Sequence, residues 1–156
     1  MGDQGLSAAE RFVGTWVLIA MEIERPDGSF DYPLGRDVAG TVTFSADGFM
    51  AVQLMARDRA KFASGDVYSS TADERTLAAA GYLAYGGRYD VDEERGTLTN
   101  HVEVSLFPNW LGRDQHRFFA FDGDQLTLST VQGFMAGGKG VARLVWRRRA
   151  PGEPLT

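Results

Sequence analysis

The second half of this 156-residue chain contains five short β-type runs in close succession, and this pattern constrains the fold most strongly. Short turn sequences such as Asp122-Gly123-Asp124 separate the runs. Gly and Asp favour such turns because they tolerate positive φ or cap the local backbone. Sequential strands without intervening helices indicate an antiparallel meander. The five runs are residues 83–91, 96–105, 115–121, 125–131 and 141–147.

The first half adds three strands and one helix. The strands are expected at 12–24, 40–45 and 49–55, with turn sequences at Pro26-Asp27-Gly28 and Ala46-Asp47-Gly48. The helix is predicted over Asp73–Ala80, with Thr71 or Asp73 as its N-cap and Gly81 at its end. The fold class is therefore all-β: an eight-stranded antiparallel up-and-down barrel with one short helix between strands 3 and 4. A β-sandwich is the structural alternative.

Length and composition indicate one domain over residues 1–156, with a core at 12–148 and a loose tail at 150–156. The absence of cysteine excludes disulfides and thiolate metal sites. Net charge is −5, and the single basic run, Arg147–Arg149, argues against nucleic acid as a partner. Residues 1–11 contain no apolar signal segment, and no run is long enough to span a membrane. A cytoplasmic protein is expected.

Gly14-Thr15-Trp16, at the start of the first strand, resembles the Gly-x-Trp pattern of calycin barrels. In such barrels the Trp packs across the base and an Arg near the chain end covers it, which implies a pairing of Trp16 with Arg147 or Arg148. Over residues 12–148 the chain resembles the bacterial and fungal lipocalin-like domain family. The resemblance is carried further by residues 47–55, 81–85 and 101–110. It implies a small β-barrel without disulfides, of a kind in which some members bind or cyclise hydrophobic intermediates of natural-product biosynthesis.

Strand alternation predicts which side chains face the barrel lumen. On residues 96–105, one face carries His101 and Glu103, and the other carries Leu98, Asn100 and Val102. A plain core would turn the second face inward, and a polar ligand cavity would turn the first inward; we predict the first. His116 falls on the face opposite Arg117 and is expected in solvent. The predicted inward set is Trp16, Gln53, Tyr85, Tyr89, His101, Glu103, Arg117 and Phe119.

His101 and Glu103 are the predicted catalytic pair, because a His titrates near neutrality and a carboxylate can polarise its ring. Glu103 could alternatively pair with Arg117. No metal-ligand spacing is present, and no cofactor is expected, although a haem held by His101 stays open. The 56–81 insert is the predicted lid. The predicted ligand-binding residues are Trp16, Gln53, Tyr82, Tyr85, Tyr89, Trp110, Arg117 and Phe119.

Three functions remain in competition. The first is the binding of a small, largely apolar molecule in the lumen. The second is a cyclase or isomerase that moves a proton on a polyketide- or terpenoid-like intermediate. The third is a filled structural barrel. A lumen above ~300 Å³ would favour the first two, and a solidly packed lumen would favour the third. The expected partner is a small hydrophobic ligand or substrate, with no membrane and with a homodimer possible.

Overall fold

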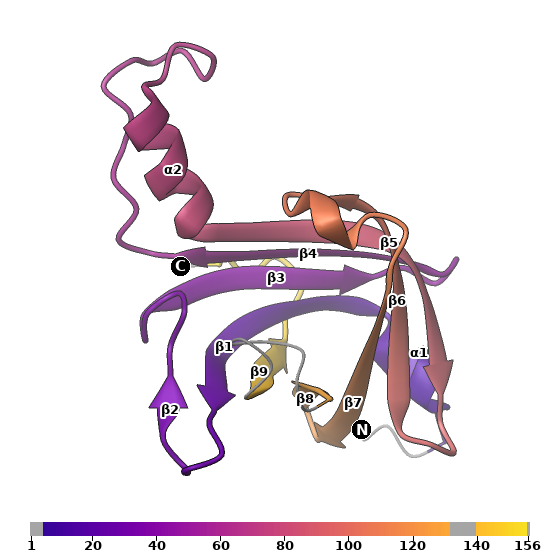
Figure 1. Cartoon of the computed structure of the whole chain (residues 1–156). Helices are drawn as coiled ribbons and strands as arrows, with labels where there is room; N and C mark the ends of the chain where they lie inside the picture. Colours follow the sequence, from indigo (N-terminus) through magenta and orange to yellow (C-terminus); the bar gives the residue numbers. More distant parts are fainter. Residues whose placement is uncertain (1–4, 132–139, 156) are drawn as a thin grey trace.

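The computed structural model describes residues 5–131 and 140–155, in which one antiparallel sheet closes on itself (Figure 1). The strand order is β2-β1-β3-β4-β5-β6-β7-β8-β9, and β1 also pairs with β9. The predicted eight-stranded barrel is therefore confirmed, with the two-residue β2 as an addition at the end of β1. The strands are β1 Gly14–Glu24, β2 Phe30–Asp31, β3 Val38–Phe44, β4 Phe49–Ala56, β5 Tyr82–Asp92, β6 Thr97–Ser105, β7 Asp114–Asp122, β8 Gln125–Thr130 and β9 Val141–Arg148.

The predicted helix is α2, Ala72–Ala80, which ends at Gly81. Thr71 is its N-cap: its hydroxyl accepts the Glu74 N–H, and the Glu74 carboxylate accepts the Thr71 N–H. The helix lies in the predicted connection. Its flanking strands are β4 and β5, not strands 3 and 4, because the structure contains the additional strand β2. Of the two predicted N-cap candidates, Thr71 and Asp73, the N-cap is therefore Thr71.

Two short helical elements were missed. The last residue of helix α1, Ala8–Phe12, was assigned to the first strand. Ser7 and Glu10 form a reciprocal capping box, which is a sequence signature of a helix N-terminus. The 3-10 helix η1, Pro108–Trp110, occupies the connection between β6 and β7. A single helical turn leaves too few positions for a period of 3.6 residues to show in the sequence.

Aromatic packing closes the end of the barrel next to α1. Phe12 is fully buried, and its ring lies 5.0–5.1 Å from the rings of Phe44, Phe119 and Phe121. Trp16 is equally buried and donates its indole N–H to the Phe12 carbonyl at 2.9 Å. This end, which we call the base, is a filled core.

Arg148 covers Trp16, as the resemblance implied, and Arg147 does not. The Arg148 guanidinium lies 4.2 Å from the centre of the Trp16 ring and donates to the Val13 and Arg11 carbonyls. Arg147 instead pairs with Glu153, whose carboxylate also accepts the Ala150 N–H. These contacts lower the pKa of Glu153 to about 2. This part of the predicted tail is thus attached to β9.

A β-bulge interrupts the pairing of β5 with β6 and fixes which side chains of β6 turn inward. The register shifts between Gly86 and Gly87. A Cβ at Gly87 would lie 1.9 Å from the His101 carbonyl oxygen, so only glycine fits there. On the base side of the bulge the inward residues of β6 are Leu98, Asn100 and Val102, which are 0%, 2% and 2% exposed.

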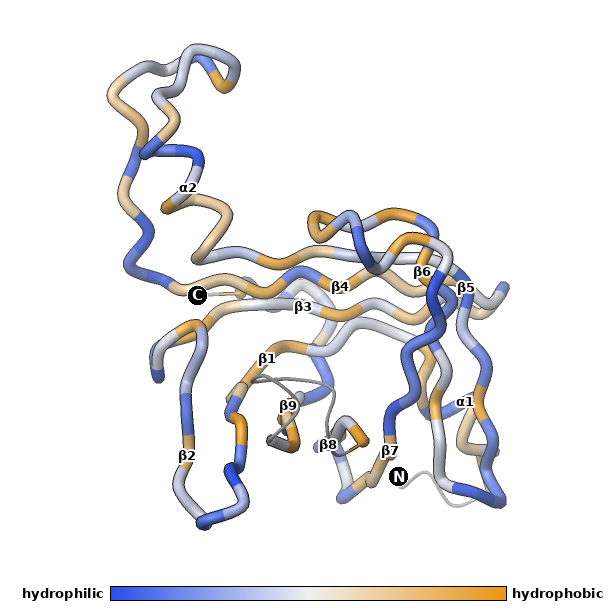
Figure 2. Tube along the Cα trace, viewed as in Figure 1, coloured by the Kyte–Doolittle hydropathy of each residue, from blue (hydrophilic) through white to orange (hydrophobic). Residues whose placement is uncertain are grey.

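The insert between β4 and β5 stands out from the barrel. Helix α2 and the loop before it extend beyond the ends of both strands (Figure 1). No residue of α2 is buried, and Tyr68 in the loop is 90% exposed. In this conformation the predicted lid does not cover the barrel. The hairpin turns are mostly hydrophilic, whereas the connection between β6 and β7 carries hydrophobic residues (Figure 2).

Candidate functional site

A small cavity lies inside the barrel, above the aromatic base. Its volume is about 30 Å³, which is room for one or two water molecules and far below the ~300 Å³ of a typical ligand pocket. The lumen is therefore neither open nor completely filled. The lining side chains are Met21, Val42, Phe44, Met50, Val52, Leu54, Leu83, Tyr85, Asn100, Trp110, Arg117, Leu128, Thr130, Ala142, Leu144 and Trp146.

Polar side chains are concentrated on one part of the cavity wall. Asn100, Arg117 and Thr130 come from the neighbouring strands β6, β7 and β8. Gln115 pairs with Asn100 across β6 and β7, and Arg117 pairs with Thr130 across β7 and β8. The side chains that β3 and β4 contribute are all apolar. A bound molecule would thus meet an apolar wall on one side and a polar wall on the other.

Some polar atoms of this wall are satisfied within the protein. The Arg117 guanidinium donates to Gln115 Oε1 at 2.7 Å and to the His116 carbonyl at 2.9 Å. The Thr130 hydroxyl accepts the Ala142 N–H at 2.9 Å. These bonds hold the buried guanidinium in place and fix the orientation of the Gln115 amide, because its oxygen is the end that faces Arg117.

Four buried polar atoms have no hydrogen-bond partner among residues 5–131 and 140–155. Ser70 Oγ lies in the loop before α2, and the other three lie on barrel strands: Asn100 Oδ1, Gln115 Nε2 and Trp146 Nε1. Asn100 and Trp146 line the cavity, and both are at least 98% buried. Unpaired buried polar atoms are uncommon in native proteins and cost free energy, so they point to a missing partner such as water or a ligand.

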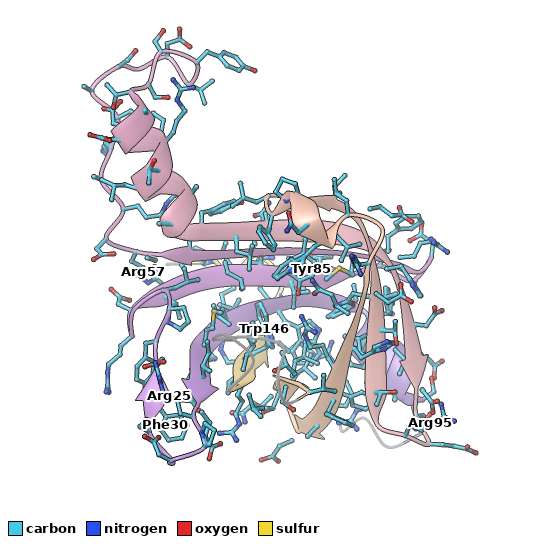
Figure 3. All side chains as sticks on the ribbon, in the orientation of Figure 1. Arg25, Phe30, Arg57, Tyr85, Arg95 and Trp146 are labelled. Carbon is cyan, nitrogen blue, oxygen red and sulfur yellow. The ribbon has the colours of Figure 1, made fainter. Side chains whose placement is uncertain are left out.

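Aromatic side chains border the cavity at the side of η1. Trp110 packs edge-on against Tyr85, with ring centres 5.2 Å apart, and against Phe107 at 5.5 Å. Tyr85 and Trp146 both lie toward the interior of the barrel (Figure 3). Trp110 is partly exposed, so it contacts both the cavity and solvent.

The other predicted ligand-binding residues separate into three groups. Tyr85, Trp110 and Arg117 line the cavity. Trp16, Tyr89 and Phe119 belong to the aromatic base, where Tyr89 packs on Phe44 and donates to the Ser45 carbonyl. Gln53 and Tyr82 line hollows on the outer surface, so the inward placement of Gln53 was wrong. The inward residues of β4 are the alternate set: Met50, Val52 and Leu54.

His101 and Glu103 face outward, so their predicted inward placement was also wrong. Turning them inward would bury two ionisable groups and expose Leu98 and Val102 to water, and both changes cost free energy. Their catalytic role stays a prediction, and the cavity wall gives it no support. His116 is exposed, as predicted.

Outside the barrel, His101 joins three strands. Its Nδ1 lies 2.7 Å from an Asp114 oxygen on β7, and its Nε2 lies 2.6 Å from an Asp90 oxygen on β5. Ionised carboxylates only accept, so the doubly protonated imidazole is the form that donates to both. The hydrogen bonds to Asp90 and Asp114 raise the pKa of His101. Glu103 pairs with Arg88 at 2.7 Å, not with Arg117. Within the described part of the chain, no three His, Asp or Glu side chains are grouped as a metal site.

Comparison with known proteins agrees with this geometry. A family described as a lipocalin-like domain matches residues 13–149. The chain belongs to the lipocalin-like domain family. It is also 33% identical, over 106 residues, to a protein of Aspergillus oryzae named 4′-hydroxy-3′-methoxypropiophenone carrier protein ppsC. The match covers 64% of this chain and 96% of that protein. The predicted family is confirmed.

In this lipocalin-like barrel, sequence reasoning missed Asn100 and Trp146 as site residues. For Trp146 a signal was present: Arg143 and Arg147 occupy the opposite face of the strand from Ala142, Leu144 and Trp146. For Asn100 the flanking Leu98 and Val102 were the signal, since they share its face. In the described residues, no helix has the length and apolar character to span a membrane.

Proposed function

We propose that this protein binds a small, largely apolar molecule in the barrel lumen and acts as its carrier. The observation that carries the proposal is the interior cavity, which is enclosed mainly by apolar and aromatic side chains and bordered by Trp110 at its exposed side. The similarity to a protein named as a carrier supports it. Burial of apolar ligand surface would supply the affinity.

Binding requires the cavity to expand, because a volume of about 30 Å³ does not hold an organic molecule. Met21 and Met50 line it, and methionine side chains adapt their shape at little cost. Trp110 lies on the three-residue helix η1 rather than on a strand, and its side chain is partly exposed. We therefore expect the side chains of Met21, Met50 and Trp110 to move when a ligand enters.

Calorimetric titration with 4′-hydroxy-3′-methoxypropiophenone tests the proposal, with two matched Ala→Leu variants. Ala142 is 1% exposed and lines the cavity, whereas Ala120 is exposed on the outer face of β7. We expect saturable binding by the natural sequence. Ala142→Leu should weaken it at least about fivefold, since overpacking typically costs about 1–3 kcal/mol. Ala120→Leu should leave it unchanged. Equal affinities for both variants would place binding outside the lumen.

A filled structural barrel is the second candidate, and the small cavity volume favours it. It predicts that neither the propiophenone nor a plain hydrocarbon such as propylbenzene binds at any soluble concentration. Heat of binding that saturates for either compound and is lost in Ala142→Leu excludes this candidate. The titration thus decides between the two functions.

A further inference from the structure

The cavity presents an unpaired hydrogen-bond acceptor and an unpaired donor on separated strands. Resting on the proposed carrier function, we propose that the lumen selects a ligand with two polar ends and an apolar body between them. A hydroxyl group at one end donates to Asn100 Oδ1. A carbonyl or ether oxygen at the other end accepts from Trp146 Nε1.

The acceptor is Asn100. Its side chain projects into the lumen from β6, between the buried Leu98 and Val102. Its Oδ1 has no partner in the part of the chain that the structure describes. The cross-strand neighbour Gln115 does not satisfy it, since the Gln115 oxygen is bonded to Arg117 and its Nε2 is itself unpaired. An amide oxygen held in this way can accept a hydrogen bond from a ligand hydroxyl.

The donor is the indole N–H of Trp146, and a comparison with Trp16 shows that its lack of a hydrogen-bond partner is unusual. Both indoles are almost fully buried within the barrel. The Trp16 N–H donates to the Phe12 carbonyl at 2.9 Å, whereas the Trp146 N–H lacks a partner among residues 5–131 and 140–155. Trp146 lines the cavity and Trp16 does not. The unpaired indole is thus the one that a cavity ligand can reach.

The positions of the two groups determine the shape of the ligand. Strands β7 and β8 lie between β6 and β9 in the sheet, so Asn100 and Trp146 enter the cavity from different parts of the wall. The strands between them contribute Arg117, Leu128 and Thr130, and the side chains that β3 and β4 contribute are all apolar. In the proposed complex, a short aromatic body with an oxygen at each end presents one polar group to each of the strands β6 and β9 and its apolar surface to the side chains of β3 and β4.

A ligand series on the natural protein tests this selection without any substitution. The parent is 4′-hydroxy-3′-methoxypropiophenone. One analogue lacks the hydroxyl (3′-methoxypropiophenone), one lacks the carbonyl (2-methoxy-4-propylphenol), and propylbenzene lacks both ends. We expect each deletion to weaken binding about 3- to 10-fold, the range of one net hydrogen bond. Propylbenzene should bind most weakly of the four.

Two variants assign the ends. Asn100→Leu should weaken the parent about 3- to 10-fold and leave 3′-methoxypropiophenone unaffected. Trp146→Phe should weaken the parent about 3- to 10-fold and leave 2-methoxy-4-propylphenol, which lacks the carbonyl, unaffected. Should Trp146→Phe fail to fold, the indole ¹⁵N–¹H resonances of the natural protein give the same answer. The Trp146 resonance should shift when the parent is added. The Trp16 resonance should keep its position, because the Trp16 N–H is already hydrogen-bonded.

The outcomes separate this proposal from the carrier function on which it rests. If the four compounds bind with equal affinity and the Trp146 resonance does not move, the lumen carries apolar molecules without this selection, and the proposal is overturned alone. If none of the four binds, the carrier function is overturned as well. Graded affinities with the two variant effects support both.

Discussion

The two faces of β6 and β7 carry polar side chains in opposite states. On the outer face, His101 is bonded to Asp90 and Asp114, and Arg88 is bonded to Glu103. On the inner face, Asn100 Oδ1 and Gln115 Nε2 lack partners in the described residues. Ionisable groups made the outer face conspicuous in the sequence. The inner face has the capacity to bind a further molecule, because its polar atoms are not already paired.

This difference shows that residue type alone does not locate a site. His101 and Glu103 have the side chains of an acid–base pair, yet their bonds are used to join strands β5, β6 and β7. A neutral amide and an indole attract less attention, yet they border the cavity. Which atoms are left unpaired decides what a wall can recognise.

The largest expected effect follows from truncation of the inner face. Leu98 is fully buried, so Leu98→Ala should lower the free energy of unfolding by about 3 kcal/mol through lost burial and a residual cavity. Thr99→Ala, the next residue on the outer face, should cost less than about 1 kcal/mol. Urea denaturation measures both. Similar losses for the two would mean that the faces of β6 are assigned incorrectly.

The bulge that sets the inward residues can be tested at Gly87. A methyl group there meets the His101 carbonyl oxygen, so Gly87→Ala should destabilise the barrel by about 2 kcal/mol. The control is Gly65→Ala in the projecting loop, where a Cβ has no neighbour within 4 Å. Thermal unfolding measures both, and a harmless Gly87→Ala would contradict the close approach of β5 to β6.

The outer cluster predicts a pH dependence of stability. The hydrogen bonds of His101 to Asp90 and Asp114 raise its folded-state pKa above the unfolded value of about 6.5. Its stabilisation is therefore fully present below that pH and is lost as pH rises through the folded-state pKa. Denaturation at a series of pH values should show this decline in the natural protein. It should disappear in His101→Gln and persist in the control His116→Gln, and a decline retained without His101 would assign it to another group.

The smallest effect is expected for the inner acceptor in the free protein. Asn100→Leu removes an unpaired buried oxygen, so the free energy of unfolding should stay level or rise by up to about 1 kcal/mol. Asp114→Asn on the outer face, which weakens a bond that is made, should lower it. If Asn100→Leu is clearly destabilising, its oxygen has a partner within the protein.

Local patterns in the sequence determined most of the fold. Turn sequences with Gly and Asp bounded the strands, and Gly14-Thr15-Trp16 indicated the base. The helix α1 was missed because one turn has no periodicity, although Ser7 and Glu10 marked its cap. Alternation correctly turned Arg117 and Phe119 inward, because two of the three phenylalanines of β7, Phe119 and Phe121, lie on that face.

The choice of face on β6 could not be made from alternation alone. Both faces carry polar groups, and the deciding factor is the cost of exposing Leu98 and Val102 against that of burying His101 and Glu103. The contacts of His101 with Asp90 and Asp114 depend on the register of three strands, which the sequence does not reveal. The unpaired state of Trp146 likewise depends on its surroundings in the folded barrel.

A crystal structure of the protein with bound 4′-hydroxy-3′-methoxypropiophenone tests the central claim most directly. We predict the compound inside the barrel, in a cavity enlarged by movement of Trp110 and the lining methionines. Its hydroxyl should face Asn100, and its carbonyl oxygen should face Trp146. A compound seated instead in the outer hollows beside Gln53 and Tyr82, with the lumen unchanged at about 30 Å³, would contradict the account.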